Sequence, residues 1–430
     1  MKPVNIGLIG YGTIGTGVVR ILQKDSALLE QKCGRPLKLK SVADLNFSER
    51  EGINSSLFTA TDDANQIIND LEIDIIIELI GGVNPAKKFI EDALNAGKHV
   101  ITANKELIAK HGQELFELAK KNKVNLNFEA STGGGIPIIN AMTSSLAANS
   151  FSKIYGILNG TTNYILTQMT QEPVEFKDVL KEAQELGYAE ANPASDVEGD
   201  DIAYKLCILS SIAFNHFFKI NDIYREGITR ISQRDIQIAK EYGMVIKMLA
   251  IGVAHNTPAD SVELRVHPVM LPASHPLASV NGSFNAVFVE GENVDESMFY
   301  GRGAGELPTA SAVMGDAIEI ARNIDSQKTS DALNFGTSQK QIIPMGNISS
   351  NFYLRFSVTD RPGVLSQISK IFGDNDVSIK LVKQDDAGND TAELNIMTHM
   401  VKESKLQKAI NEIKELTAVT EISSILRMSL

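Results

Sequence analysis

Short apolar runs alternate with amphipathic, helix-like stretches along the first third of the chain. The apolar runs cover residues 4–9, 37–43, 73–80, 99–102 and 124–128, and helix-like segments such as 85–96 and 112–122 lie between them. Continuous apolar runs of this length are typical of strands that are buried on both faces of a parallel sheet. Right-handed crossovers between such strands give an open sheet with helices on both faces. The pattern therefore predicts a doubly wound α/β domain over residues 1–130.

From Gly133 onward the pattern of the chain becomes mixed. A glycine-rich turn, a helix opened by Pro137, a strand-like segment at 152–158 and a strongly apolar helix from Asp200 to Phe214 follow one another. Strand-like segments at 262–271 and 286–289 come next. We expect a second, mixed α/β domain over residues 131–307. The helix-like segment at 308–325 is expected to return to the first domain.

The C-terminal part of the chain has a pattern of its own. Residues 326–350 are polar, rich in Gln, Ser, Thr and Asn, and show little periodicity, which is typical of a linker. Beyond them, segments 353–359, 362–373, 377–383, 391–398, 402–415 and 419–427 read as strand, helix, strand, strand, helix and strand. This is the order of a ferredoxin-like domain, which we expect over residues 351–430. The polar linker favours a C-terminal domain that can be removed from the rest.

A glycine motif follows the first strand directly. It reads Gly10-Tyr11-Gly12-Thr13-Ile14-Gly15 and opens an amphipathic helix. In such a turn the first two glycines let the backbone approach a pyrophosphate, and the third allows close packing of helix on strand. Because strand, motif and helix coincide, we predict that residues 10–15 bind a dinucleotide in a Rossmann domain. Asp44 ends the second strand, where it either binds ribose hydroxyls or serves as a turn residue.

Two further strands of the predicted sheet end in residues that can meet a ligand. The strand at 73–80 is followed by Gly81 and Gly82, which bring the backbone close either to the cofactor or to another turn. The strand at 99–102 is followed by Lys105. Ligands bind at the carboxyl ends of strands in open α/β sheets, so Lys105 is well placed for substrate or cofactor. The alternative is a solvated lysine at the start of a helix.

Carboxylates cluster just ahead of the apolar helix in the second predicted domain. The string from Glu190 to Lys205 contains Asp196, Asp200 and Asp201. Asp201 and Lys205 are four residues apart and share a helix face. On a solvated face they would form an ordinary ion pair, but Ile202, Leu206 and their neighbours make the helix largely apolar. Lys205 is therefore expected near the interior, where desolvation lowers the pKa of an amine and suits it to proton transfer.

Three turns in the middle of the chain carry small or polar residues. Asn159-Gly160-Thr161 can bind the carboxylate or amino group of an amino acid, or can simply cap a helix. The turn from Glu129 to Ile136 places a carboxylate beside flexible backbone carbonyls, which suits a hard cation but also fits a glycine hinge. The turn from Gly301 to Glu306 either brings backbone against a nicotinamide or only precedes Pro308.

The composition narrows the classes of protein. The net charge is −12 and the pI is near 5.2, which argues against general binding to nucleic acid or to anionic membranes. Two cysteines and seven scattered histidines make a disulfide framework, a zinc cluster or a cysteine nucleophile improbable. The N-terminus reads straight into a strand without the apolar region of a signal peptide, and no apolar run approaches a membrane span. We therefore expect a cytoplasmic protein.

Taken together, these strings closely resemble the homoserine dehydrogenase family over nearly the whole chain. The matching stretches are 10–17, 78–85, 102–106, 129–137, 159–163, 187–205 and 301–308, and the string from 190 to 205 is highly characteristic. The resemblance implies a reversible hydride transfer between the nicotinamide of NAD or NADP and aspartate 4-semialdehyde, which yields homoserine. It also implies that the second domain binds the substrate and provides dimer contacts.

The resemblance also implies roles for individual residues. Lys205 would be the proton donor and Lys105 its polar partner, while Glu190 and Asp201 would hold the ammonium of homoserine with support from Asp196 and Tyr188. Further residues are implied in the cofactor site, namely Gly81, Gly187, Gly303 and Glu306. A sodium ion would bind at Glu129, Thr132, Gly134 and Ile136, with Thr132 where a Val is common. Family members that prefer NADP often carry a basic residue beside Asp44, and here Ala43 and Leu45 flank it, with Arg50 further on.

The C-terminal pattern resembles the ACT domain, on the string Asp360-Arg361-Pro362-Gly363 and the order of its segments. This implies pairing between copies, hence a homodimer or homotetramer, and binding of an amino-acid effector such as threonine. Two other classes of dehydrogenase agree less well with the sequence. A phosphoglycerate-type dehydrogenase would carry its glycine motif mid-chain with a catalytic His, and a phosphorylating aldehyde dehydrogenase needs a reactive Cys. A non-catalytic sensor would have no use for Lys105 and Lys205.

Overall fold

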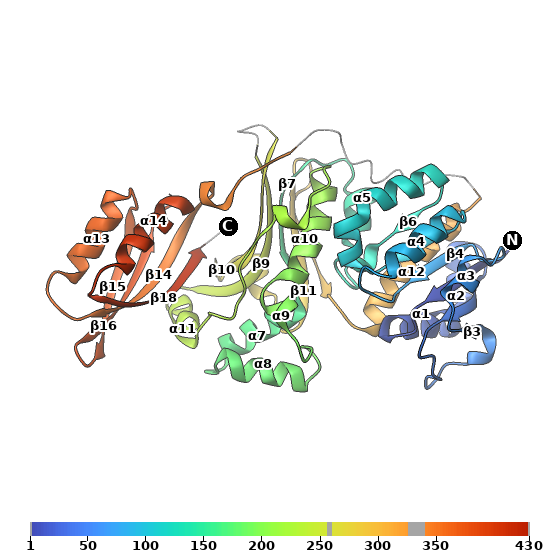
Figure 1. Ribbon diagram of the computed structural model, residues 1–430, viewed down its shortest axis with the longest axis horizontal. Helices are drawn as coiled ribbons and strands as arrows, with labels where there is room; N and C mark the ends of the chain where they lie inside the picture. Colours follow the sequence, from blue (N-terminus) through green and yellow to red (C-terminus); the bar gives the residue numbers. More distant parts are fainter. Residues whose placement is uncertain (1, 256–259, 326–339, 429–430) are drawn as a thin grey trace. The chain divides into compact units, whose positions relative to one another are not determined.

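The computed structural model describes residues 2–255, 260–325 and 340–428 (Figure 1). The chain divides into two compact units, each built from three segments of sequence. The first unit comprises Met1–Leu158, Ala203–Asp222 and Phe284–Gln339, and the second comprises Asn159–Ile202, Ile223–Ser283 and Lys340–Leu430.

The first unit contains a six-stranded parallel sheet in the order β3-β2-β1-β4-β5-β6. The strands are β1 (Val4–Ile9), β2 (Leu37–Ala43), β3 (Thr59–Thr61), β4 (Ile75–Glu78), β5 (His99–Thr102) and β6 (Leu126–Asn127). Helices α1 (Thr13–Lys24), α2 (Ser26–Cys33), α3 (Ala64–Ile68), α4 (Ala86–Asn95) and α5 (Lys105–Asn122) connect them. The predicted Rossmann domain is confirmed, and its strand order reverses between β1 and β4, where such sheets bind dinucleotides.

The core of this sheet follows from the apolar runs. Ile6, Leu8, Ile75 and Ile77 are fully buried because helices cover both faces. Helix α12 (Glu306–Asn323) packs on α1 and contributes Ala310, Val313, Met314, Ala317, Ile320 and Ala321 to the same core. The short strand β3 escaped the sequence analysis because its Thr-Ala-Thr stretch carries no apolar run.

The rest of the first unit is mixed. Strands β7 (Phe151–Ile157), β11 (Phe284–Gly291) and β12 (Asp295–Arg302) pair antiparallel in the order β12-β11-β7. Sequence reasoning missed β12, because its polar, largely exposed residues give no apolar pattern. Helix α10 (Asp200–Ala213) carries the strongly apolar sequence, and the helix expected after Pro137 is a short α-turn, α6 (Ile138–Asn140), followed by a π-turn at Ala141–Ser145.

The second unit combines the central part of the chain with the C-terminal domain. Strands β9 (Met244–His255) and β10 (Ser261–Pro272) form a long antiparallel pair beside α7 (Gly160–Gln171), α8 (Phe176–Glu185), α9 (Ala194–Val197) and α11 (Gln233–Glu241). The C-terminal sheet has the order β18-β14-β16-β15. Its elements are β14 (Ser349–Thr359), α13 (Val364–Asp374), β15 (Ile379–Gly388), β16 (Thr391–Thr398), α14 (Glu403–Lys414) and β18 (Val419–Met428), which confirms the ferredoxin-like order.

The C-terminal domain is joined to β10 by main-chain pairing. Residues 326–339 of the expected linker lie outside the described residues. Within the rest of the expected linker, β13 (Gln341–Ile342) pairs parallel to β10. At the other end of the chain, β18 also pairs with β10, through Val269 opposite Arg427 and Met270 opposite Met428. Polar composition does not prevent such pairing, because it uses backbone groups. Strand pairing thus connects both ends of the C-terminal segment to β10.

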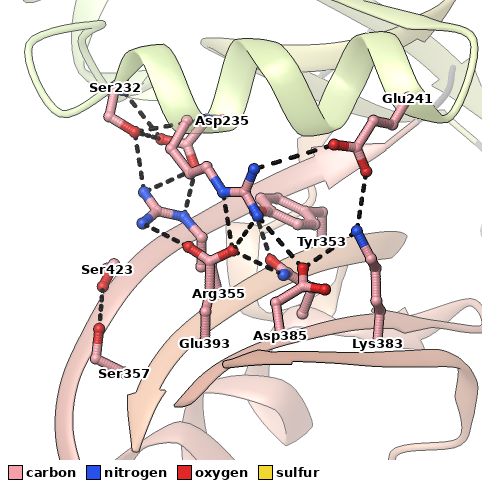
Figure 2. A network of polar contacts seen from close by, with 12 residues as sticks. Ser232, Asp235, Glu241, Tyr353, Arg355, Ser357, Lys383, Asp385, Glu393 and Ser423 are labelled. Atoms are coloured by element: carbon pink, nitrogen blue, oxygen red, sulfur yellow. Dashed lines mark hydrogen bonds and ion pairs between the residues drawn. The ribbon is translucent and has the colours of Figure 1, made fainter. Parts of the chain in front are cut away.

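Ion pairs join helix α11 to the C-terminal sheet (Figure 2). Arg355 of β14 donates to the Asp235 carboxylate at 3.1 Å and to the Ser232 hydroxyl at 2.9 Å. Asp235 is fully buried. Arg234, the residue before Asp235, donates to Glu393 of β16 at 2.6 Å. The network therefore holds the first turn of α11 against two strands of the C-terminal domain.

The outer part of this network is more exposed. Lys383 of β15 donates to Glu241, at the end of α11, over 3.1 Å and also lies 3.1 Å from Asp385 (Figure 2). The Lys383 side chain is 39% exposed, whereas that of Arg355 is 11% exposed. The network thus contains a buried and a solvated ion pair on one helix.

None of the helices in the described ranges is both long and apolar enough to cross a bilayer.

Candidate active site

The glycine turn has the geometry that a dinucleotide needs. Gly10 has a φ of +103°, and a Cβ there would lie 2.7 Å from the carbonyl carbon of Leu79. A Cβ on Gly15 would lie 2.1 Å from the Gly10 oxygen, so only glycine allows the helix to start this close to the strand. A Cβ on Gly12 would meet nothing within 4 Å. Gly12 therefore leaves open space in front of α1, whose N-terminus lacks a side-chain cap.

Asp44 is tied to this turn by its side chain. Its two carboxylate oxygens accept hydrogen bonds from the backbone N–H of Tyr11 at 2.6 Å and of Asn46 at 2.8 Å. The Tyr11 ring stacks on Phe47 with 5.2 Å between centroids, and the guanidinium carbon of Arg50 lies 5.8 Å from the Tyr11 centroid. The loop after β2 thus folds back over the glycine turn, and it brings Arg50 with it.

A buried carboxylate, which sequence reasoning missed, organises the ends of β4 and β5. Glu78 is fully buried, and burial raises its pKa. It accepts hydrogen bonds from the Ile80 N–H at 2.8 Å and from the Thr102 hydroxyl at 2.7 Å. The Thr102 oxygen in turn accepts the Asn104 N–H at 3.0 Å. Asn104 caps α5 by accepting the Leu107 N–H, which makes Lys105 the first residue of that helix.

The Asn104 side chain also reaches the loop after β4. Its amide donates to the carbonyl of Gly82 at 2.5 Å, and the adjacent Gly81 has a φ of +75°. The glycine pair and the half-buried Lys105 are therefore held by one polar network at the carboxyl edge of the sheet. The signal that could have revealed it is a Glu inside an otherwise apolar strand run.

Lys205 is buried within the first unit, as the apolar helix suggested. Its side chain belongs to α10, is 9% exposed, and donates from Nζ to the carbonyl oxygen of Leu158 at 2.7 Å. Asp201 lies one turn earlier on the same helix and is 6% exposed. The next residue along the chain from Leu158 is Asn159, which begins the small polar turn. The carbonyl contact fixes the ammonium group of Lys205 in a defined position.

Asn159 connects the carboxylates that the sequence placed together. Its side-chain amide donates to Asp196 at 2.7 Å and to Asp201 at 3.0 Å, and its oxygen accepts the Thr162 N–H at 2.8 Å. It therefore caps α7 and orients both aspartates at once. The sequence predicted a polar turn here, but it did not predict that Asn159 joins Asp196 to Asp201. The Thr161 hydroxyl donates to the Tyr188 carbonyl, which joins the start of α7 to the segment before Glu190.

The remaining residues for which the sequence implied a role in substrate or cofactor binding are exposed. Glu190 is exposed, and Tyr188 is 43% exposed with its ring 4.8 Å from that of Tyr164. Gly187 is exposed with a φ of +76° and open space where a Cβ would be. Lys105 and Lys205 belong to the first unit, while Glu190, Asp196 and Tyr188 belong to the second. Each group is therefore described only within its own unit.

The turn from Gly301 to Glu306 is tightly packed within the first unit. A Cβ on Gly303 would lie 2.0 Å from the Asn285 side-chain nitrogen, and a Cβ on Gly134 would lie 2.3 Å from the Gly303 oxygen. Glu306, the first residue of α12, is paired with Arg20 of α1 at 3.0 Å. This links the turn to the helix that follows the glycine motif.

The loop expected to hold a cation is largely buried. The Glu129 carboxylate accepts the N–H groups of Ile139 at 2.9 Å and Asn140 at 2.6 Å, and burial raises its pKa to about 7. Its side chain is thus held in place by backbone N–H groups, one on each carboxylate oxygen. Within the described part of the chain, the hydroxyls of Ser131 and Thr132 are buried without a hydrogen-bond partner. Across the same residues there is no cluster of three or more His, Cys, Asp or Glu side chains suited to a metal ion.

Comparison with known families identifies the chain. The family model for the NAD-binding domain of homoserine dehydrogenase matches residues 10–129, the model for homoserine dehydrogenase matches 137–318, and the ACT domain model matches 352–418. The chain is an NAD(P)-dependent oxidoreductase with a C-terminal ACT domain. More particularly, the chain belongs to the homoserine dehydrogenase family.

Similar proteins extend over the whole chain. A homoserine dehydrogenase of Neisseria gonorrhoeae is 42% identical and covers 100% of this chain and 99% of its own length. One of Bacillus subtilis is 38% identical, with the same coverage of 100% and 99%. The crystal structure of a homoserine dehydrogenase from Thiobacillus denitrificans is 38% identical, covers 100% of this chain and 98% of its own, and has a TM-score of 0.93.

Proposed function

We propose that the protein catalyses the reversible NAD(P)H-dependent reduction of L-aspartate 4-semialdehyde to L-homoserine, in the biosynthesis of threonine, methionine and isoleucine. The observation that carries this proposal is the buried Lys205. Its ammonium group is fixed by the Leu158 carbonyl at 2.7 Å, on the helix that also carries Asp201. A fixed, buried ammonium suits proton transfer to a substrate oxygen.

The two lysines have different roles at the reacting carbonyl. When bound, the nicotinamide supplies the hydride to the aldehyde carbon. Lys205 donates the proton to the aldehyde oxygen, and Lys105 polarises that oxygen from the start of α5. In the reverse direction Lys205 accepts the proton of the homoserine hydroxyl. The Glu78 network supports this role of Lys105, because it fixes the helix start from which the side chain extends.

The substrate's amino-acid end is assigned to residues of the second unit. Glu190 and Asp201 bind the ammonium group, with Asp196 and Tyr188 in support. Gly160 and Thr161 begin α7, so their N–H groups suit the carboxylate of the substrate. The support for this assignment is Asn159, which joins Asp196 and Asp201 to the first turn of the same helix.

The dinucleotide is assigned to the carboxyl edge of the parallel sheet, with either NAD or NADP as cofactor. The residues proposed to hold it are Gly10, Tyr11, Gly12, Thr13, Ile14, Gly15, Asp44, Gly81, Lys105, Gly187, Gly303 and Glu306. Supporting this, Gly12 leaves space before an uncapped helix, where pyrophosphate oxygens bind backbone N–H groups.

A sodium ion is proposed at the loop of Glu129, Thr132, Gly134 and Ile136, through backbone oxygens. The buried hydroxyl of Thr132 has no hydrogen-bond partner among the described residues, as expected if an ion or water accompanies it. Glu129 is held beside these carbonyls by its hydrogen bonds to the N–H groups of Ile139 and Asn140. Oxygen ligands are those that hard cations prefer.

The chain's regions are proposed to divide these tasks. Residues 1–130 with the helix at 308–325 bind the cofactor, 131–307 bind the substrate and contribute to a homodimer or homotetramer, and 326–350 link them to the ACT region. The ACT domain at 351–430 binds an amino-acid effector, for which threonine is the first choice as the pathway's product.

Replacing Lys205 tests the proposed chemistry. Lys205→Met should lower kcat for homoserine oxidation by about 10²–10⁴-fold, because a general acid–base group is lost. The dissociation constant of the cofactor, measured by fluorescence titration, should stay unchanged. Lys88→Met, which alters a side chain 70% exposed on α4, serves as the control and should retain wild-type rates. A folded Lys205→Met protein with near-normal kcat would remove the proposed role.

A further inference from the structure

A lysine outside the proposed catalytic groups is buried beside the substrate turn. Lys247 lies on β9 and is 3% exposed. Its ammonium donates to the Val280 carbonyl at 2.5 Å, to the Asn163 side-chain oxygen at 3.2 Å and to the Asn281 side-chain oxygen at 3.2 Å. An ammonium group has three protons, so each of the three can find an acceptor. All three acceptors belong to neutral groups.

The acceptors of Lys247 join two segments that are distant in sequence. Asn163 lies in the first turn of α7, and Val280 and Asn281 lie in the loop before β11. Asn163 strengthens the link, because its own amide donates to Val280 at 3.1 Å and to Gly282 at 2.9 Å. We call residues 280–283 the clamp loop. Lys247 thus fastens the clamp loop to the start of α7.

The clamp loop lies directly against the substrate turn. A Cβ on Gly160 would lie 3.0 Å from the carbonyl oxygen of Ser283, so only a residue without a side chain fits there comfortably. Further along, the Gly282 N–H donates to the Thr167 hydroxyl at 3.1 Å, one turn after Asn163. The loop therefore follows the first two turns of α7 and sets the position of Gly160. Any outward movement of the loop would leave the first turn of the helix without support.

Burying a lysine at this place costs folding free energy unless its ammonium group makes hydrogen bonds. Burial alone lowers the pKa of Lys247 to about 8, so burial disfavours the ammonium form. An apolar side chain would fill the same space without that cost, but it would leave Asn163, Asn281 and the Val280 carbonyl without its protons. The charged form supplies three hydrogen bonds from a single atom, and hydrogen bonds from charged donors are stronger than neutral ones.

We propose that Lys247 is a positioning residue for the substrate, which sets the affinity for the amino-acid end of homoserine by clamping the loop of residues 280–283 to the first turn of α7. The proposal rests on the proposed function, since that function assigns the turn to the substrate. Lys247 acts through Asn163 and the clamp loop and touches neither the reacting carbonyl nor the cofactor. Loss of Lys247 is therefore expected to raise KM for homoserine more than it changes kcat.

The chain offers a matched control for this test. Lys98 is also a buried lysine, 5% exposed, whose ammonium donates to neutral oxygens, the carbonyls of Asp70 and Ile73. Burial likewise lowers its pKa. It precedes β5 and so lies at the amino edge of the parallel sheet, away from the edge where ligands bind. Lys98→Met should reproduce the general cost of removing a buried lysine and nothing else.

The test compares the steady-state kinetics of Lys247→Met and Lys98→Met in the full-length protein. Lys247→Met should raise KM for homoserine by about tenfold or more and change kcat less than KM, because hydrogen bonds from a charged group are lost. Lys98→Met should keep KM within about twofold of wild type. Asn281→Ala, which removes one acceptor only, should raise KM by a smaller factor and covers the case in which Lys247→Met does not fold. An unchanged KM in the folded Lys247→Met protein, or in Asn281→Ala if that is the variant obtained, would overturn the proposal.

Hydrogen exchange separates failure of this inference from failure of the proposed function. If wild-type protein does not oxidise homoserine, the proposed function fails, yet the clamp can still be measured without substrate. Lys247→Met, or Asn281→Ala in its place, should then show faster amide exchange in residues 160–163 and 280–283 than Lys98→Met does. Equal exchange in these segments would show that no clamp exists, whatever the substrate.

Discussion

At the level of single residues, we expect Arg50 to affect the choice between NAD and NADP. Asp44 is flanked by Ala43 and Leu45, which cannot bind a phosphate, and this favours use of NAD. The structure nevertheless brings Arg50 to 5.8 Å from the centroid of Tyr11, whose N–H is bonded to Asp44. A guanidinium in this place can pair with the 2′-phosphate of NADP beyond the second strand.

Replacing Arg50 should therefore change the ratio of the two cofactors. In Arg50→Ala, kcat/KM with NADP should fall by about tenfold or more relative to that with NAD, because a charged hydrogen bond to phosphate is removed. Steady-state assays of homoserine oxidation with each cofactor measure the ratio. Lys38→Ala, an exposed cation on β2, should leave it unchanged. If Arg50→Ala also leaves the ratio unchanged, Arg50 makes no contact with the phosphate of NADP.

At the scale of elements, helix α11 joins the ACT sheet through pairs of unequal burial. Asp235 is fully buried and relies on Arg355, whereas the pair of Lys383 and Glu241 is solvated. A buried carboxylate left without its cation is destabilising, whereas a surface ion pair contributes little because water screens it. Helix α11 also contacts α7. The ACT sheet is thus joined through one helix to the element that begins with the substrate turn.

Two substitutions in this network should differ in their effect on the free energy of unfolding. Arg355→Met should cost about 3–5 kcal/mol, because Asp235 stays buried without its partner. Lys383→Met should cost about 0–1 kcal/mol. Urea unfolding monitored by circular dichroism gives both values, provided that each transition is two-state. Equal losses from the two variants would mean that burial of Asp235 does not govern this contact.

At the level of the whole molecule, the C-terminal domain shares a sheet with β9 and β10. Arg427 of β18 is 3% exposed and donates to Glu226 at 2.7 Å and to Glu403 at 2.8 Å. Its strand pairs with β10. Removal of the domain would leave Val269 and Met270 of β10 without the strand that pairs with them. It would also take the cations away from Glu226 and the buried Asp235. Unpaired strand edges favour aggregation.

Truncation before Ser349 should therefore yield a protein of low solubility and reduced activity. Light scattering and homoserine oxidation, with the full-length chain prepared in parallel, measure both effects. A monodisperse truncated protein with wild-type activity would show that the catalytic region is independent of the ACT domain. In that case a threonine titration is decisive for regulation, since a response retained after truncation places the effector site outside residues 351–430.

Features that depend on neighbours along the chain could be predicted from the sequence. The glycine motif, the apolar strands and the ferredoxin-like order follow from backbone conformation and hydrophobic periodicity over a few residues, and Gly10 and Gly15 are required by the turn that they form. The largely apolar sequence around Lys205 predicted its burial in the same way. The comparisons with known proteins confirmed the family that these local strings indicated.

The tertiary structure alone decided which distant residues meet. Lys247 and Val280 are separated by 33 residues and Asp235 and Arg355 by 120, so no local pattern connects them. The strand β9 around Lys247 and the edge strand β12 were missed, and the polar linker proved partly paired with β10. The physical reason is that burial, strand pairing and hydrogen bonds between distant segments depend on how the whole chain packs, whereas turns and periodicity do not.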